Sequence, residues 1–225
     1  MRCVKRGGVV WALVALDLGL GVAGLASNAA ANGIACPDGA TCLSFEIELG
    51  SQRTGEFGTL ALQDVGDDVE FTITLNKAAL GSHANLNEFY FNLPEGFDID
   101  EDDIFSASCD DDVDFELAEG RPVRGGAGAE FDFSLNFEAD EKERIQRVSF
   151  ILEDLSVEEV LEAAFANPGV TGRGLEVLFA AHIQGSGHGR GSASATVGVP
   201  VPEPGTAALF GLGLAGIAFV GRRRS

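Results

Sequence analysis

Hydrophobic and polar residues alternate along the middle of the chain with the period of two that marks β-strands. The segments 130–138 (EFDFSLNFE) and 69–76 (VEFTITLN) show this pattern most clearly, and clusters of Gly, Asn and Asp separate the alternating runs. Alternation of this kind indicates one buried and one solvent-facing side, as in an antiparallel sheet. The predicted strands are 43–50, 58–65, 69–76, 87–94, 113–119, 130–138, 145–154 and 174–185, followed by a last strand before the C-terminal tail.

One segment has helical spacing instead. Ser156 and Glu159 form the two ends of a capping box, and "NPG" at 167–169 ends the segment. Its apolar positions follow the helical period: Val157, Val160, Leu161, Ala164 and Phe165. We therefore predict an all-β fold, mainly an antiparallel β-sandwich of jelly-roll or immunoglobulin-like kind, with one short connecting helix.

The first 31 residues have the three parts of a secretory signal peptide. Arg2, Lys5 and Arg6 form a basic start, 9–16 is an apolar run, and small residues near Ala29 and Ala31 suit cleavage after either one. Asp17 disfavours a permanent membrane anchor, because an acid at a membrane centre costs about 2.5 to 3.5 kcal/mol. Lipidation of Cys36 is disfavoured, since Gly33 stands where a large aliphatic residue is expected.

Export changes the interpretation of the cysteines. Cys36 and Cys42 flank a Pro-Asp-Gly turn, and in an oxidising compartment such a pair forms a small-loop disulfide. Two cysteines alone do not make a structural zinc site, which needs four ligands. Cys109 is left over, as a buried, free or intermolecular thiol.

The C-terminal tail has a different composition from the rest. Val201, Pro202, Glu203 and Pro204 precede 17 uncharged residues, 205–221, which as a helix would measure about 25 Å. That length is at the short edge of the membrane-spanning range. The basic residues Arg222, Arg223 and Arg224 would hold the far end in the cytoplasm by the positive-inside rule, leaving the body outside the inner membrane.

This order of Pro-Glu-Pro, apolar helix and arginine cluster resembles the PEP-CTERM sorting signal of Gram-negative bacteria. The resemblance implies that an exosortase, a membrane protease analogous to sortases, recognises 201–204 and delivers the protein to the cell surface or extracellular matrix. It also implies an association with exopolysaccharide and biofilm formation. The residues of the motif would be a recognition site for another enzyme and have no catalytic role in this chain. The expected organisation is a signal peptide (1–31), an exported β-sandwich domain (32–199) and a sorting tail (200–225).

The charge of the chain narrows the range of partners. Its formal net charge is −20, and several of its 15 basic residues lie in the two terminal segments, so the exported body is strongly acidic. Such a body is repelled by nucleic acid and by anionic lipid, which excludes nucleic-acid binding.

Candidate catalytic groups are few, and we expect no enzyme activity and no cofactor. The histidines are His83, His182 and His188. A metal site formed by His182 and His188 is disfavoured, because two nitrogen ligands alone do not make up the ligand set of a protein metal site. The glycine-rich "GSGHGRG" lacks the Lys-Ser/Thr of a P-loop. The acidic segment 98–116 suits Ca²⁺ by its oxygen ligands, but it does not match an EF-hand loop, and a solvated acidic loop is favoured over a calcium site.

Two classes of function follow. The first is a non-catalytic surface or matrix protein that contributes adhesion or structure to the polysaccharide layer. The second is a carbohydrate-binding or carbohydrate-active module. Sugar binding usually uses exposed aromatic faces, and after signal removal Tyr90 is the sole Tyr or Trp, so the first class is favoured.

Overall fold

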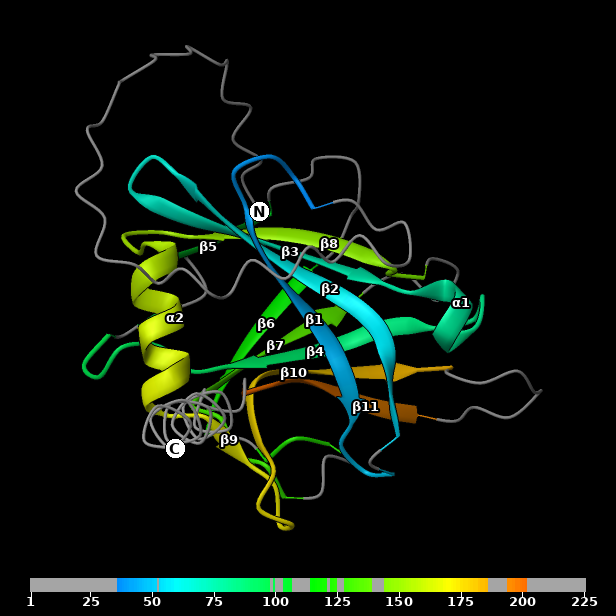
Figure 1. Cartoon of the computed structure of the whole chain (residues 1–225). Helices are drawn as coiled ribbons and strands as arrows, with labels where there is room; N and C mark the ends of the chain where they lie inside the picture. The colour runs from blue at the N-terminus through cyan, green and yellow to red at the C-terminus, as the bar shows by residue number, and fades with distance from the viewer. Residues whose placement is uncertain are drawn as a thin grey trace, which may run out of the picture.

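In a computed structural model, the described residues are 36–51, 53–97, 99, 103–106, 114–120, 122–124, 128–138, 144–185 and 194–201. They form one continuous antiparallel sheet with two helices at its margins (Figure 1). The strands are β1 (Thr41–Glu48), β2 (Thr54–Val65), β3 (Asp68–Leu75), β4 (Asn85–Phe91), β5 (Ile104–Ser106), β6 (Asp114–Glu119), β7 (Phe133–Glu138), β8 (Arg147–Leu152), β9 (Gly169–Val170), β10 (Glu176–Gln184) and β11 (Ser194–Pro200). The helices are α1 (Lys77–Leu80) and α2 (Val157–Ala166).

The sheet folds back on itself to make two layers. Its strand order is β5-β8-β3-β2-β1-β11-β10-β4-β7-β6, with β9 paired to β10. Strand β1 joins the halves: it pairs with β2 along most of its length and with β11 only at Ile47 and Glu48, after a register shift between Phe45 and Ile47. A β-bulge of this kind bends a strand, which lets the two halves face each other.

Phenylalanine rings fill the space between the layers. Phe150 of β8 stacks on Phe71 of β3 at 4.9 Å between ring centroids, and it also lies within 6.3 Å of rings on the opposite layer. Those opposite rings are Phe89 of β4, Phe115 of β6 and Phe137 of β7. The all-β prediction is therefore confirmed, and the phenylalanines are mainly core residues. The jelly-roll or immunoglobulin-like subtype stays a prediction.

Helix α2 begins as the sequence predicts. The Ser156 hydroxyl accepts a hydrogen bond from the Glu159 N–H, and Glu159 Oε2 accepts one from the Ser156 N–H at 2.9 Å. Asp64 of β2 also accepts from the Val157 N–H at 2.8 Å, which fixes the first turn to the sheet. The buried face consists of Val157, Val160, Ala163 and Ala164. Phe165, although it has the predicted apolar spacing, is 38% exposed.

Three elements were not predicted: α1, β5 and β9. Asn76, assigned by its pattern to the end of a strand, is instead the N-cap of α1, and its side-chain oxygen accepts from the N–H groups of Ala78 and Ala79. Strands β5 and β9 have three and two residues, too few for an alternating pattern to appear.

The predicted strand 130–138 is shorter in the structure, and its first residues leave the sheet. The alternation placed Phe131 on the same face as Phe133, but β7 begins only at Phe133, and Phe131 packs in a second, smaller cluster. The reason is a side-chain hydrogen bond: Asn92 Oδ1 accepts from the Asp132 N–H at 2.6 Å and turns the chain there. The second cluster lies on the outer side of β4 and β10, to which it is attached through the paired residues Tyr90 and Ala180.

Candidate functional site

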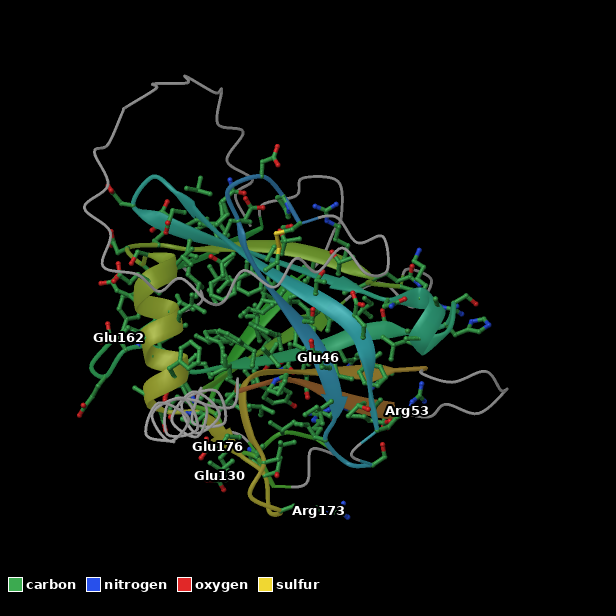
Figure 2. The ribbon with its side chains drawn as sticks, viewed as in Figure 1. Glu46, Arg53, Glu130, Glu162, Arg173 and Glu176 are labelled. Atoms are coloured by element: carbon green, nitrogen blue, oxygen red, sulfur yellow. A yellow bond between two sulfur atoms is a disulfide. The ribbon has the colours of Figure 1, made fainter. Side chains whose placement is uncertain are left out.

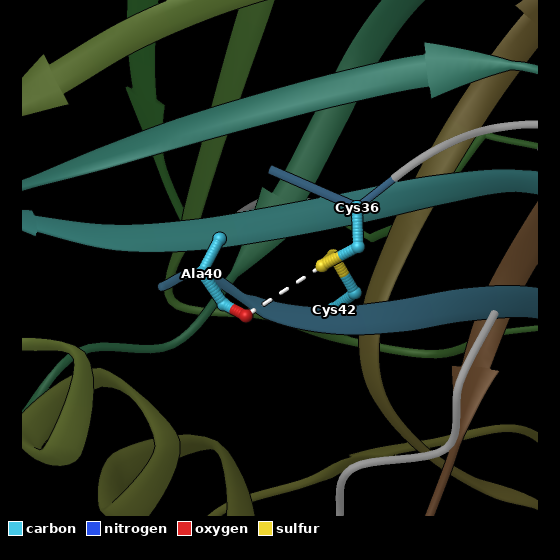
Figure 3. Close-up of a disulfide and its surroundings, with 3 residues drawn as sticks. All are labelled: Cys36, Ala40 and Cys42. Carbon is cyan, nitrogen blue, oxygen red and sulfur yellow. Dashed lines mark hydrogen bonds between the residues drawn. A yellow bond between two sulfur atoms is a disulfide. The ribbon is translucent and has the colours of Figure 1, made fainter. Parts of the chain in front are cut away.

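The Cys36–Cys42 disulfide is present in the structure, with 6.1 Å between the two Cα atoms (Figure 3). Cys42 lies in β1 and is buried, whereas Cys36 is exposed in the segment that leads into the strand. The bond therefore attaches the start of the described chain to a strand in the middle of the sheet. Cys109 lies outside the described residues.

The sorting-motif residues lie at the end of the last strand. Val201 is described; Pro202, Glu203, Pro204 and the basic residues Arg222, Arg223 and Arg224 lie outside the described residues, as does the predicted signal peptide. No helix in the part of the chain that the structure describes is long and apolar enough to cross a membrane. The apolar run 205–221 is not in that part, so its spanning role stays a prediction.

The acidic segment is described only in part. Within the described ranges, no group of three or more His, Cys, Asp or Glu side chains is arranged to hold a metal ion. Most of 98–116, where the calcium alternative was placed, is outside those ranges, and so is His188. His83 lies apart from His182, with its Nδ1 hydrogen-bonded to Arg144 Nη1.

A row of buried polar side chains crosses the outer face of the layer that contains β4, β10 and β11. Glu88 of β4, His182 of β10 and Thr196 of β11 are direct neighbours in register, so their side chains lie on the same face. Glu88 is 3% exposed and His182 6% exposed, although both carry ionisable groups. Polar side chains are seldom buried to this extent without hydrogen-bond partners.

The partners come from within the row and from the loop above it. Tyr90 donates its hydroxyl proton to Glu88 Oε2, and Arg124 Nε lies 3.0 Å from Glu88 Oε1. The Arg124 N–H donates to the Tyr90 oxygen at 3.1 Å. Thr196 donates its hydroxyl proton to the Arg124 carbonyl. We call Glu88, Tyr90, Arg124, His182 and Thr196 the polar cluster.

The single hydroxyl proton of Thr196 determines the tautomer of His182. Because that proton goes to the Arg124 carbonyl, Thr196 Oγ1 can only accept from His182 Nδ1, which is 3.2 Å away. Nδ1 therefore carries the hydrogen of the neutral ring. Burial lowers the pKa of His182, and the Arg124 charge lowers it further, while Glu88 acts in the opposite direction.

For Tyr90 the same burial acts in the other direction: it raises the pKa of the hydroxyl, and the neighbouring Glu88 raises it further. Tyr90 therefore stays protonated and remains a donor throughout the physiological range. With its donors and acceptors satisfied internally, the polar cluster fixes the 122–124 segment to the sheet. His182 and Thr196 are both buried, so little of either side chain is accessible to a substrate in this arrangement.

The sequence did not point to this cluster. His182 was identified as a possible metal ligand, whereas Glu88 and Arg124 are single charges in unremarkable contexts. The signal that could have found it is an ionisable residue within a predicted strand: Glu88 in 87–94 and His182 in 174–185. Its partners could not be found in this way, because they depend on strand register.

The buried imidazole predicts a pH dependence of stability. The pKa of His182 is lowered from 6.5 in the folded protein, so the unfolded chain binds the proton first as the pH falls. Stability from this residue is complete above pH 6.5 and is lost as the pH falls from 6.5 to the folded pKa, by up to about 1.4 kcal/mol per pH unit. In urea unfolding between pH 7.5 and 5, we expect wild type to lose more stability than His182→Gln.

The control for that experiment is His83→Gln, which replaces the histidine that lies apart from the polar cluster. All three proteins are measured at the same pH values, and the effect of His182 is the difference between wild type and His182→Gln that His83→Gln does not reproduce. A wild type and a His182→Gln variant with parallel stability profiles over this range would contradict the prediction.

The comparisons with known proteins concern the end of the chain. Residues 200–224 match the family model of the PEP-CTERM protein-sorting motif. Neither a curated protein nor a solved structure gives a significant match to the chain. The sorting-signal resemblance is therefore confirmed, and the match includes Pro200 and Val201, which the structure describes.

Proposed function

Because the chain carries a PEP-CTERM protein-sorting motif at 200–224, we propose that it is a non-catalytic protein of the extracellular polysaccharide matrix. The motif implies export, a membrane-anchored intermediate and processing by an exosortase. The cell surface or the extracellular space is the proposed destination, and exopolysaccharide is the proposed partner there. The observation that carries the proposal is the motif itself.

Properties of the folded domain support this assignment. A disulfide at the start of the first strand suits an oxidising compartment outside the cytoplasm. The strong negative charge keeps an exported protein soluble at high local concentration. In the described residues the ionisable groups with large burial belong to an internal hydrogen-bond network, which is the pattern of a structural scaffold.

The alternative function is a carbohydrate-binding module, with or without calcium. The structure offers it less support, because Tyr90 is buried beneath the 122–124 segment. Phe165 is the most exposed aromatic side chain in the described ranges, and a single ring makes a small platform for a sugar. Binding to a glycan array that depends on calcium would favour this alternative over the matrix protein.

The sorting function predicts a clear difference between wild type and Pro202→Ala/Pro204→Ala in the native host. Replacing both prolines removes the stiff, extended segment that another protein would grip. We expect wild type to lose its C-terminal segment and appear outside the cell, and the double variant to keep the segment and stay in the inner membrane. Intact mass and cell fractionation measure both properties.

The matched control is Pro37→Ala, which changes an exposed proline in the disulfide loop and leaves the tail unchanged. It should be processed like wild type. If wild type and the double variant both keep the tail and remain in the membrane, the tail is an anchor, and the matrix function loses its main support.

A further inference from the structure

The chain leaves the folded domain from the middle of the sheet. Strand β11 lies between β1 and β10, and its last residue, Pro200, is opposite Val177 near the start of β10. The next residue, Val201, is also held: its N–H donates to the Glu176 carbonyl at 3.2 Å, and its side chain packs against the main core. The backbone is therefore fixed to the sheet up to Val201.

The sorting motif begins inside this fixed segment. The family match starts at Pro200, and Pro202 is the residue directly after Val201. One residue of extended chain spans at most about 3.6 Å, so the whole of Pro202–Pro204 lies within about 11 Å of Val201. No flexible linker separates these three residues from the fixed Val201. A protein that binds them must therefore also approach the surface of the domain.

The surface beside this exit is partly apolar. On the far side of Glu176 from Val201 lies Val170 of β9, which is paired with Glu176 and is 49% exposed. Two strand spacings separate the flanking strands, about 10 Å, so Val170 is within reach of anything that holds the motif. Phe165, 38% exposed, lies at the end of α2 only four residues before β9.

Phe165 and Val170 are the most exposed large hydrophobic side chains in the described ranges, and they lie in two consecutive elements, α2 and β9. Charged residues lie at the same end of the molecule: Glu176 is paired with Val170, and Figure 2 shows Glu176 and Arg173 where β9 lies in Figure 1. We call Phe165, Val170, Arg173 and Glu176 the exit surface. An apolar centre with a charged border is typical of a protein interface.

We propose that the membrane protein that reads Pro202–Pro204 also docks on the exit surface of the folded domain. The inference rests on the proposed sorting function, and it adds a second recognition element to it. The partner is an integral membrane protein, because the apolar run that follows the motif leads to the membrane. Recognition then requires a folded body, since Val170 is near Val201, the residue directly before Pro202, only when β9, β10 and β11 are paired.

The first test replaces the apolar side chains in the full chain: Phe165→Ser/Val170→Ser, expressed in the native host. Pulse-chase labelling measures the rate at which the C-terminal segment is lost. We expect the rate to fall roughly tenfold, as when an apolar contact at the centre of an interface is removed. The control, Glu162→Ser/Thr54→Ser, changes one exposed residue on α2 and one at the start of β2, and should leave the rate unchanged.

The second test leaves the domain surface intact. Twelve Gly-Ser residues inserted between Val201 and Pro202 separate the motif from the domain by about 20 Å on average. We expect slower processing of this protein, and no further loss when Phe165→Ser/Val170→Ser is added. Processing of the spaced wild type at the normal rate or faster would overturn the proposal, as would normal processing of the unspaced double-serine variant.

The Pro202→Ala/Pro204→Ala variant separates this inference from the sorting function. If that variant fails to be processed while the exit-surface and spacer variants behave like wild type, the motif is read alone, and only the docking proposal falls. If the double-alanine variant is processed normally, the sorting function itself is wrong, and the docking proposal fails with it. Urea unfolding of the double-serine variant, expected to match wild type, excludes an effect of misfolding.

Discussion

Phe150→Ala is expected to lower the free energy of unfolding by about 3 to 5 kcal/mol, the range for a large core ring replaced by alanine. Phe150 is fully buried in β8 and contacts rings of β3 in its own layer and of β4, β6 and β7 in the other. Its removal leaves a cavity at the place where the layers meet, and these neighbours lie on strands whose hydrogen bonds limit their collapse into the space. Urea unfolding followed by circular dichroism measures the loss.

Two variants make that result interpretable. Phe165→Ala removes the same ring from an exposed position and should change stability by no more than about 0.5 kcal/mol. Phe150→Leu keeps most of the volume and should cost about 1 kcal/mol. If Phe150→Ala costs no more than Phe165→Ala, the two layers do not share the core that the structure describes.

Glu88→Ala is expected to cost about 2 to 3 kcal/mol, mainly through the tyrosine that it leaves behind. The Tyr90 hydroxyl donates to Glu88 and is buried, so without the carboxylate this proton has no acceptor. The ion pair itself contributes less, because the Arg124 side chain is 59% exposed and water can solvate the guanidinium. Urea unfolding at pH 7.5 measures the difference.

A double-mutant cycle with Tyr90→Phe tests this reason directly. Tyr90→Phe removes the hydroxyl, so the further change Glu88→Ala leaves no unpaired donor there. We expect the double variant to be more stable than the sum of the single effects predicts, by about 1 kcal/mol or more. Glu116→Ala, an exposed carboxylate two strands along the same row, serves as the control and should have little effect.

Exact additivity of Glu88→Ala and Tyr90→Phe would contradict the account given for the polar cluster. It would mean that the stability at Glu88 comes from packing or from the Arg124 pair. The measured coupling energy therefore shows whether the hydrogen bond between Tyr90 and Glu88 stabilises the fold or whether the two side chains are merely close to each other.

The sequence determined the features that depend on local pattern. Alternation of apolar and polar residues predicted the long strands, because a half-buried strand has a period of two regardless of its neighbours. Ser156 and Glu159 predicted the start of α2, because a capping box is complete within four residues. The sorting motif was visible for the same reason: 201–204 and the segment after them are contiguous in the chain.

The tertiary structure decided everything that depends on which strands are neighbours. Phe131 was predicted to face the core, but Asn92, distant in sequence, turns the chain before β7 and sends that ring to the outer cluster. The polar cluster unites β4, β10, β11 and a loop, and no local pattern specifies their register. Likewise, only the central position of β11 shows that the sorting motif follows the domain without a spacer. Segments with similar alternating patterns could pair in many orders, so the local pattern does not specify the strand order. Side-chain packing between the two layers stabilises one of these orders over the others.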